Sequence, residues 1–123
     1  MGIDTEIHSY KDLIVWQKSM NLVVKIYELT EKFPKSEIYG LISQMRRSAV
    51  SIPSNISECR RRSSRKDFRN FLVIAYGSGS ELETQLEIAK RLQFGNNSDY
   101  EEVDSFLSEV MRMLNKMLSG LRS

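Results

Sequence analysis

The chain has 123 residues, of which 41% are hydrophobic and 28% charged, and its 18 basic and 16 acidic residues give a formal net charge of +2. This length and composition predict one folded domain spanning residues 1–123 and exclude a disordered chain. A single cysteine excludes an intrachain disulfide, and the acidic start and short apolar runs predict neither a secretion signal nor a membrane span, so we expect a cytoplasmic protein with no membrane partner.

The first predicted helix begins after Ser9 and ends at Phe33-Pro34. Ser9 and Asp12 form a capping-box pattern, and proline disfavours the helical conformation in the residue before it. Between these limits, apolar residues recur at alternating spacings of three and four, which is the period of an amphipathic helix. The predicted core stripe comprises Leu13, Trp16, Met20, Val23 and Tyr27.

The second predicted helix starts near Ile38 and continues across Pro53, because its apolar rhythm survives the proline. We therefore expect one kinked helix, in which carbonyl groups near the proline bond to serine or asparagine side chains or to water. Those side chains are Ser51, Ser54, Asn55 and Ser57. On a heptad, the two core positions hold Ile42, Ala49 and Ile56, and Met45, Ile52 and Cys59.

Two further helices follow, and each is preceded by a capping-box pattern: Ser64 with Asp67, and Ser98 with Glu101. The third carries Phe68, Phe71, Leu72, Ala75, Leu82, Leu86, Ala89 and Leu92, and stops before Gly95-Asn96-Asn97. The fourth carries Val103, Phe106, Leu107, Val110, Leu114 and Met117, and stops at Gly120. Since no strand pattern competes, the sequence predicts an all-α, antiparallel up-down four-helix bundle with a Pro-kinked second helix.

Positive charge is concentrated between Gln44 and Asn70. In this stretch eight cations face only two acidic residues, a local charge of +6, whereas the whole chain carries +2. The cations are Arg46, Arg47, Arg60, Arg61, Arg62, Arg65, Lys66 and Arg69. A concentrated cationic face is typical of a protein that binds a phosphate-rich partner, although exposed cations screened by salt would give the same pattern.

Four of the arginines are spaced to form a cationic rail along the second helix. Arg46 and Arg60, like Arg47 and Arg61, are two heptads apart, which places each pair about 21 Å apart on nearly one face. Further on, Arg65 and Lys66 occupy a first helical turn, where the helix dipole disfavours cations unless an anion binds the free amides. No aromatic residues are interleaved for base stacking, so we expect recognition of an RNA or DNA backbone rather than of bases.

Other polar motifs do not predict catalysis. Residues 76–80 contain two glycines but lack the Gly-Lys-Ser/Thr of a phosphate loop, so we interpret the glycines as sites of close helix packing. Glu81, Glu83 and Glu87 lack the Glu-x-x-His partners of a di-metal bundle, because His8 is the single histidine. Cys59 falls on the apolar stripe and is predicted to be buried. We therefore expect no catalytic residue, metal site or cofactor.

Several segments together resemble the 23S rRNA-intervening-sequence protein family of bacterial four-helix bundles. The resemblance covers nearly the whole chain and departs from the family pattern at Cys59, where the family has glycine. The matching segments are DLIVWQK at 12–18, FP at 33–34, EIYGL at 37–41 and QMRRSAVSIPSNISE at 44–58, then Phe71, Leu72, Ala75, Gly77, Ser78, Glu81, Leu82, Glu83, Gln85, Leu86 and Leu92.

The resemblance implies a homo-oligomeric ring, a pentamer, and a kinship with accessory variability determinant proteins of diversity-generating retroelements. Those relatives bind nucleic acid and a reverse transcriptase, and the family implies a binding role rather than an enzymatic one. Five copies would bring five clusters of +6 onto one assembly, which would attract RNA before specific contacts form.

Four functions stay open from the sequence. The segregated charge favours a non-enzymatic, oligomeric protein that binds structured RNA or DNA through the eight cations. A second reading is a scaffold whose basic face docks an acidic protein, such as a reverse transcriptase. In a third, the basic residues hold subunits together through Glu81, Glu83 or Glu87 of a neighbour. A catalytic role is the fourth, but no group of converging titratable residues supports it.

Overall fold

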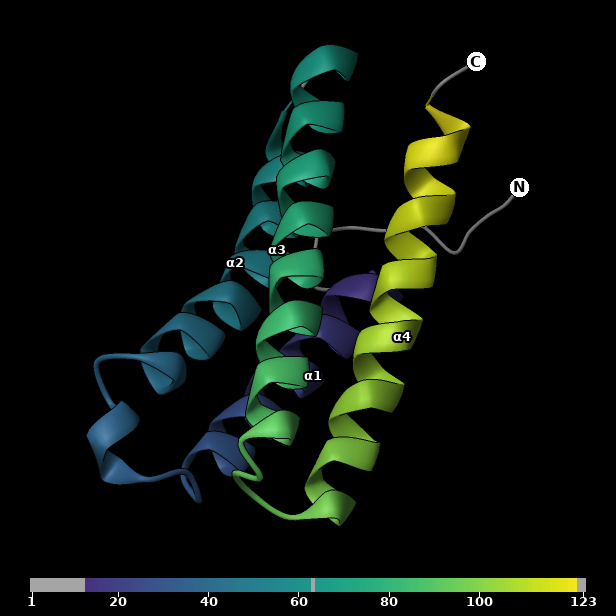
Figure 1. The fold of residues 1–123 in the computed structure, drawn as a ribbon. Coiled ribbons are helices and arrows are strands. Elements are labelled where there is room, and N and C mark those ends of the chain that lie inside the picture. The colour runs from purple at the N-terminus through teal and green to yellow at the C-terminus, as the bar shows by residue number, and fades with distance from the viewer. Residues whose placement is uncertain (1–12, 63, 122–123) are drawn as a thin grey trace.

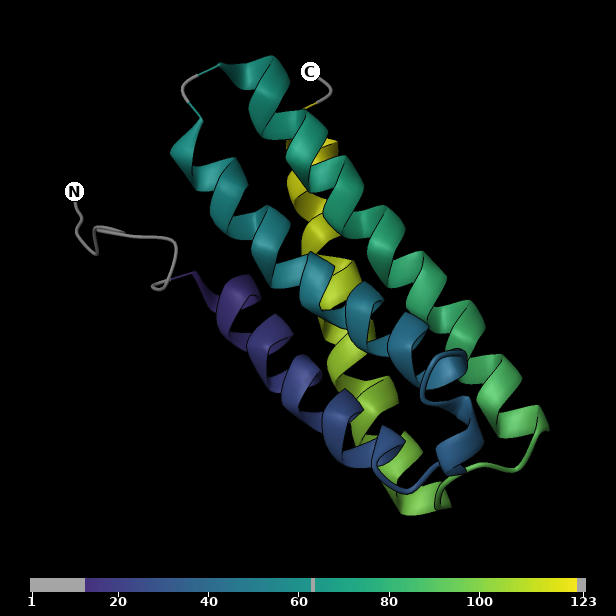
Figure 2. The same cartoon turned by 90° about the vertical axis from the view of Figure 1, so that its left-hand side faces the viewer.

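The computed structural model describes residues 13–62 and 64–121, so the predicted Ser9–Asp12 cap and His8 lie outside the described residues. Its elements are α1 (Ile14–Thr30), a short 3-10 helix η2 (Lys35–Glu37), α2 (Leu41–Arg61), α3 (Arg65–Arg91) and α4 (Asn97–Gly120). Consecutive α-helices run antiparallel, and α4 packs against both α1 and α3 (Figures 1 and 2). The predicted all-α four-helix bundle is confirmed.

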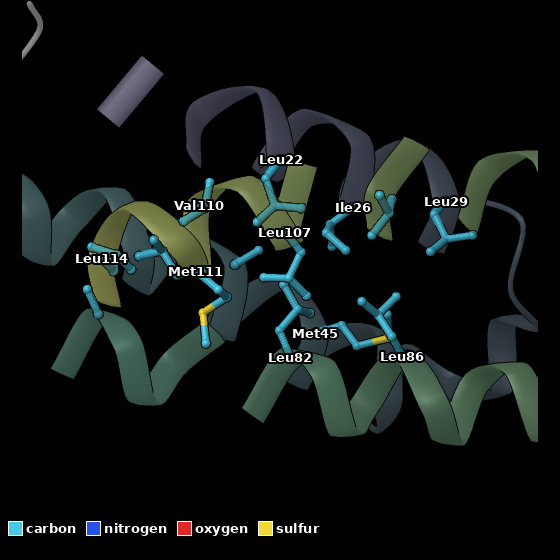
Figure 3. Close-up of a cluster of buried hydrophobic side chains, with 14 of the residues drawn as sticks. Leu22, Ile26, Leu29, Met45, Leu82, Leu86, Leu107, Val110, Met111 and Leu114 are labelled. Atoms are coloured by element: carbon cyan, nitrogen blue, oxygen red, sulfur yellow. The ribbon is translucent and has the colours of Figure 1, made fainter. Parts of the chain in front are cut away.

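Large apolar side chains from all four helices meet along the bundle axis (Figure 3). Leu22 and Ile26 of α1 face Leu107 of α4, and Leu82 of α3 lies next to Met45 of α2. Each of these side chains is buried. The six heptad positions predicted for α2 are all buried as well, so that helix has the predicted orientation.

The core stripe predicted for α1 is wrong in its phase. The side chains that reach the core belong to Val15, Ser19, Leu22, Ile26 and Leu29. In the predicted stripe, Met20 and Tyr27 are instead 39% and 42% exposed, and Trp16 and Val23 are half-buried. Both series repeat at spacings of three and four, so the period identifies a helix without choosing between two adjacent faces. The predicted stripe therefore forms one edge of α1, beside α2.

The second helix is continuous across Pro53 and changes direction along its length (Figure 1). It begins at Leu41 rather than near Ile38, which follows η2 and is exposed. As predicted, side chains bond to carbonyl groups near the proline: Asn55 Nδ2 donates to the Ser51 oxygen at 2.8 Å. Ser57 Oγ likewise donates to the Ser54 oxygen at 2.8 Å.

The two capping boxes predicted for α3 and α4 differ in outcome. Ser64 Oγ accepts a hydrogen bond from the Asp67 amide at 3.0 Å, which confirms Ser64 as the N-cap of α3. The second does not form, because α4 starts at Asn97 and Ser98 already lies within its first turn. The preceding turn passes through a left-handed conformation at Gly95, with φ of +78°, which suits a residue that has no Cβ.

The two glycines in α3 have different surroundings. A Cβ on Gly79 would collide with the Met111 sulfur of α4, so close packing explains this glycine as predicted. A Cβ on Gly77 would have no atom of the described chain within 4 Å. The packing interpretation is therefore wrong for Gly77 within a single chain.

Candidate nucleic-acid interface

Six of the eight predicted cations lie at one end of the bundle, where α2 ends and α3 begins. The end of α4 lies at the same place, because Arg65 Nη2 donates a hydrogen bond to the Leu121 oxygen at 3.2 Å. Figure 2 shows the end of α2 and the start of α3 at the same end of the bundle as the C-terminal turns of α4. We call it the basic end and define it by Arg60, Arg61, Arg62, Arg65, Lys66 and Arg69.

Four cations of the basic end are exposed and have no hydrogen-bond or ion-pair partner in the described part of the chain. Their side chains make no hydrogen bond or ion pair with any other residue in the described ranges 13–62 and 64–121. These residues are Arg60, Arg61, Lys66 and Arg69. Their charges are therefore available to a polyanion without first breaking an intrachain contact.

Arg62 is held by its own chain. Its guanidinium group forms an ion pair with Glu58 at 2.7 Å and lies over the Phe71 ring at 5.0 Å from the centroid. Both contacts orient the guanidinium along the α2–α3 junction. Arg62 thus contributes positive field at the basic end but is less free to bind a phosphate directly.

Arg46 turns toward α1 and does not continue the predicted rail. Its Nε donates to Thr30 Oγ1 at 2.9 Å, its Nη2 lies 3.5 Å from a Glu31 carboxylate oxygen, and its guanidinium covers the Tyr27 ring at 4.4 Å. Arg46 therefore ties α2 to α1. The heptad spacing predicted the face of α2 correctly, but α1 occupies that face and provides acceptors for the guanidinium. The expectation that Arg46 and Arg60 form one solvent-facing rail is wrong.

Arg47 remains exposed near the middle of the molecule. Its Nη2 donates to Ser43 Oγ at 3.3 Å, and it forms no ion pair with a carboxylate among the described residues. Arg47 lies along α2, fourteen positions before Arg61, so it is about 21 Å from the basic end.

One further cation close to the basic end was missed by the sequence reasoning. Lys116 is exposed on α4, whose last helical residue is Gly120. It therefore lies about 6 Å along the helix axis from the end of α4. Lys116 is more than 40 positions from the basic cluster in the sequence, so only the antiparallel topology could have placed it there.

The opposite end of the bundle is acidic. The first two turns of α4 hold Asp99, Glu101, Glu102 and Asp104. Three of these carboxylates pair with lysines of α1, of the turn after α1 and of α3: Lys25–Glu102 at 3.3 Å, Lys32–Asp99 at 2.8 Å and Lys90–Asp104 at 2.7 Å. Carboxylates near a helix N-terminus are stabilised by the helix dipole. The molecule is therefore polarised along its axis.

The chemistry of the basic end is that of an anion-binding surface. The backbone amides of Arg65 and Lys66 lie in the first turn of α3 and have no intrahelical acceptor, while Ser64 already caps the Asp67 amide.

Cys59, near the basic end, is buried, and desolvation raises the pKa of its thiol to about 11. The thiol is therefore protonated near neutral pH and is not a nucleophile there.

The described residues contain neither a cluster of metal-ligating side chains nor a membrane-spanning helix. No three His, Cys, Asp or Glu side chains within 13–62 and 64–121 gather into a group that could hold a metal ion. In the same part of the chain, every helix falls short of the length and apolarity needed to cross a membrane.

Comparisons with known proteins agree with this architecture. A family model described as 23S rRNA-intervening sequence protein matches residues 11–116. Among solved structures, the chain resembles a crystal structure of a protein with unknown function from the S23 ribosomal protein family of Bacteroides thetaiotaomicron. The two are 29% identical with a TM-score of 0.78, over 86% of this chain and 96% of that chain. A search of curated proteins gave no match.

Proposed function

The chain belongs to the 23S rRNA-intervening sequence protein family, and from that premise we propose that it is a non-enzymatic, oligomeric protein that binds the phosphate backbone of RNA through its basic end. The observation that carries the proposal is the group of four exposed cations that have no hydrogen-bond or ion-pair partner among the described residues. The family description, which names an rRNA intervening sequence, favours RNA over DNA as the polyanion.

The local electrostatics also support this role. Arg60 and Arg61 extend from the last turn of α2, and Lys66 and Arg69 from the first turns of α3. Cations at a helix N-terminus oppose the helix dipole by a few tenths of a kcal/mol each, and a bound phosphate removes that opposition. No aromatic ring lies free among these side chains for base stacking, which favours backbone over base recognition.

The direct test is the affinity for structured RNA as a function of salt. Engagement of about five phosphates by neighbouring copies predicts a slope of log K against log salt of roughly −4. The Arg60→Ala/Arg61→Ala variant should lose affinity to a similar degree for RNAs of different sequence and show a shallower slope. A flat salt response of the wild type would refute the proposal.

A matched control removes the same net charge from the other end of the molecule. Lys35 of η2 and Arg91 of α3 are both exposed and lie at the acidic end. The Lys35→Ala/Arg91→Ala variant should keep the wild-type affinity and slope. An equal loss in both double variants would mean that net charge, rather than the basic end, controls binding.

The oligomeric part of the proposal concerns avidity. Several basic ends on one assembly would raise the effective concentration of cations along an RNA, and the resemblance to ring-forming relatives suggests five copies. A reverse transcriptase is the protein partner that the same resemblance suggests. If the chain copurified with an acidic protein after complete nuclease digestion and did not bind RNA, the basic end would serve protein docking instead.

A further inference from the structure

A groove with mostly apolar walls runs between α1 and α2, and the Arg46 guanidinium lies over its Tyr27 ring at 4.4 Å. The groove consists of two adjoining cavities of about 310 and 450 Å³, both of which are lined by Val50. Its α1 wall is the stripe that lies outside the core, and Val50 itself is 40% exposed. We call this surface the α1/α2 groove and define it by Trp16, Met20, Val23, Tyr27, Val50 and Pro53.

The solvent side of α3 carries a second helical stripe in addition to its core face. Its members follow one another at spacings of three, four, three and four, the period of a packed helix face. All are exposed, with Ile74 at 48% and Ile88 at 45%. This α3 stripe consists of Ile74, Gly77, Glu81, Thr84 and Ile88.

Gly77 lies near the middle of the α3 stripe and has no intrachain explanation. Glycine within a helix costs about 1 kcal/mol relative to alanine, yet a Cβ here would meet open space. A missing side chain on an exposed helix face lets another chain approach the helix backbone closely. The α3 stripe thus has the features of a contact surface whose partner is outside the single chain.

The groove and the stripe match in length. Along α2 the groove runs from Ile42 to Ser57, and the stripe runs from Ile74 to Ile88. The groove covers fifteen helical steps and the stripe fourteen, which corresponds to about 22 Å and about 21 Å. A groove between two helices is a common seat for one face of a third helix.

The two surfaces also match in height along the bundle axis. The hydrogen bond of 2.7 Å between the Ser51 and Ser78 hydroxyls puts these residues at one level of the antiparallel pair α2 and α3. Arg47, four residues before Ser51, is therefore level with Leu82 and adjacent to the level of Glu81. Arg47 and Glu81 of one chain accordingly line a common cavity between α2 and α3. A neighbour related by rotation alone would keep these levels, so its Glu81 would lie at the height of Arg47 of the first copy.

We propose that the α3 stripe of one copy docks in the α1/α2 groove of the next copy, with Glu81 and Arg47 paired across the contact. Because the groove and the stripe are different surfaces, the contact is heterologous, and rotation without a rise closes it into a ring. Arg47 forms no ion pair in its own chain, and neither does exposed Glu81, within residues 13–62 and 64–121. This inference rests on the oligomeric part of the proposed function.

The test is a mixing experiment followed by light scattering. Val50→Glu places a charge in the groove but keeps the stripe, and Gly77→Gln obstructs the stripe but keeps the groove. Each variant alone should fall to the monomer mass of 14.3 kDa. An equimolar mixture should then form one-to-one dimers of twice that mass, because the mixture retains one intact groove and one intact stripe per pair.

Controls separate assembly from folding. Val24→Glu, on an exposed part of α1 outside the groove, and Ser105→Gln, on the exposed side of α4, should keep the wild-type mass. The helix content measured by circular dichroism should be unchanged in every variant. If Val50→Glu loses helix content, Met20→Glu serves as a second variant that places a charge in the groove.

Three outcomes would overturn the inference: a monomeric wild type, a Gly77→Gln variant that still assembles, or a mixture of the two variants that stays monomeric. The second would point to groove-to-groove pairing, and the third to a different partner. Failure of RNA binding is separately visible, because monomeric Val50→Glu retains the basic end and should keep a salt-dependent, weaker affinity for RNA.

Discussion

Arginine residues of identical chemistry have different roles in this chain. Arg46 lies over Tyr27 and bonds to buried Thr30, so it links two helices. Arg60 and Arg61, at the end of the same helix, make no contact with an acceptor in the described residues. What separates the two roles is whether an acceptor and an aromatic ring of another helix lie within reach of the guanidinium.

Arg46 is therefore expected to contribute to stability, and Arg60 is not. Arg46→Ala removes a cation–π contact and leaves the Thr30 hydroxyl without this donor, so the free energy of unfolding should fall by about 1–2 kcal/mol. Arg60→Ala should change it by less than about 0.5 kcal/mol, as expected for an exposed side chain. Urea denaturation measures both values, and equal losses would contradict the distinction.

Cys59 gives the folded state a pH dependence. Burial raises the pKa of its thiol from near 9 to about 11, so the folded chain keeps a proton that the unfolded chain loses. As the pH rises from 9 to 11 the unfolded state binds fewer protons, and the free energy of unfolding should fall by on the order of 2 kcal/mol. Below pH 9 both states are protonated, so this contribution to the pH dependence vanishes.

Cys59→Ala is the control for this pH dependence. Thermal unfolding in reducing buffer at pH 8 and pH 11 should show a smaller difference for Cys59→Ala than for the wild type. The same difference in both proteins would assign the pH dependence to other groups, such as Tyr100, whose pKa burial and nearby carboxylates raise to about 12.

At the scale of elements, α3 has two distinct faces, one packed in the core and one that carries the exposed α3 stripe. One face packs into the core, where Gly79 lets Met111 of α4 approach. The solvent face carries the α3 stripe, in which a Cβ on Gly77 would meet no atom of the described residues within 4 Å. Gly77 and Gly79 thus lie on opposite sides of one helix, because two residue steps of about 100° each separate them by about 200° around the helix axis.

Substituting each glycine by alanine separates these two surroundings. Both changes gain about 1 kcal/mol of helix propensity, but Gly79→Ala also overpacks against Met111 at a typical cost of about 1–3 kcal/mol. In the Val50→Glu background, where assembly should not contribute, Gly77→Ala should stabilise the chain and Gly79→Ala should not.

A double-mutant cycle identifies the cause. Met111→Ala should abolish the difference between the two alanine variants, as measured by urea denaturation. If Gly79→Ala stabilised the chain as much as Gly77→Ala, the close approach of α3 and α4 would be refuted.

At the scale of the whole molecule, charge is distributed along the bundle axis. Cations gather where α2 ends and α3 begins, and carboxylates gather where α4 begins. α4 spans 24 residues between the two ends, which corresponds to about 36 Å. At physiological ionic strength the Debye length is about 8 Å, so the acidic end barely weakens the field at the basic end.

This separation predicts an ionic-strength-dependent effect of the acidic end. Glu101→Gln, at an exposed residue of that end, should leave the RNA affinity within about twofold at 0.15 M salt because of screening. At 0.01 M salt, where the Debye length is about 30 Å, the same variant should bind RNA more tightly than the wild type. Equal effects at both salt concentrations, measured by fluorescence anisotropy, would contradict an axial separation of charge.

The sequence by itself determined the helices and most of their inward faces. The apolar period located four helices, and the heptad of α2 placed Met45, Ile52 and Ile56 in the core. The Ser64 cap was also predicted, because its donor is three residues away. These features depend on residues within a few turns of each other, which propensity and period describe.

Tertiary structure decided the phase of α1, the direction of Arg46 and the location of Lys116. Each depends on which helix lies alongside: α2 covers the edge of α1 that holds Trp16, α1 supplies the acceptor for Arg46, and antiparallel topology brings α4 to the basic end. A one-dimensional period cannot determine such features, since a helix with two apolar stripes satisfies the same pattern on either face. The neighbouring helices select the face that is buried.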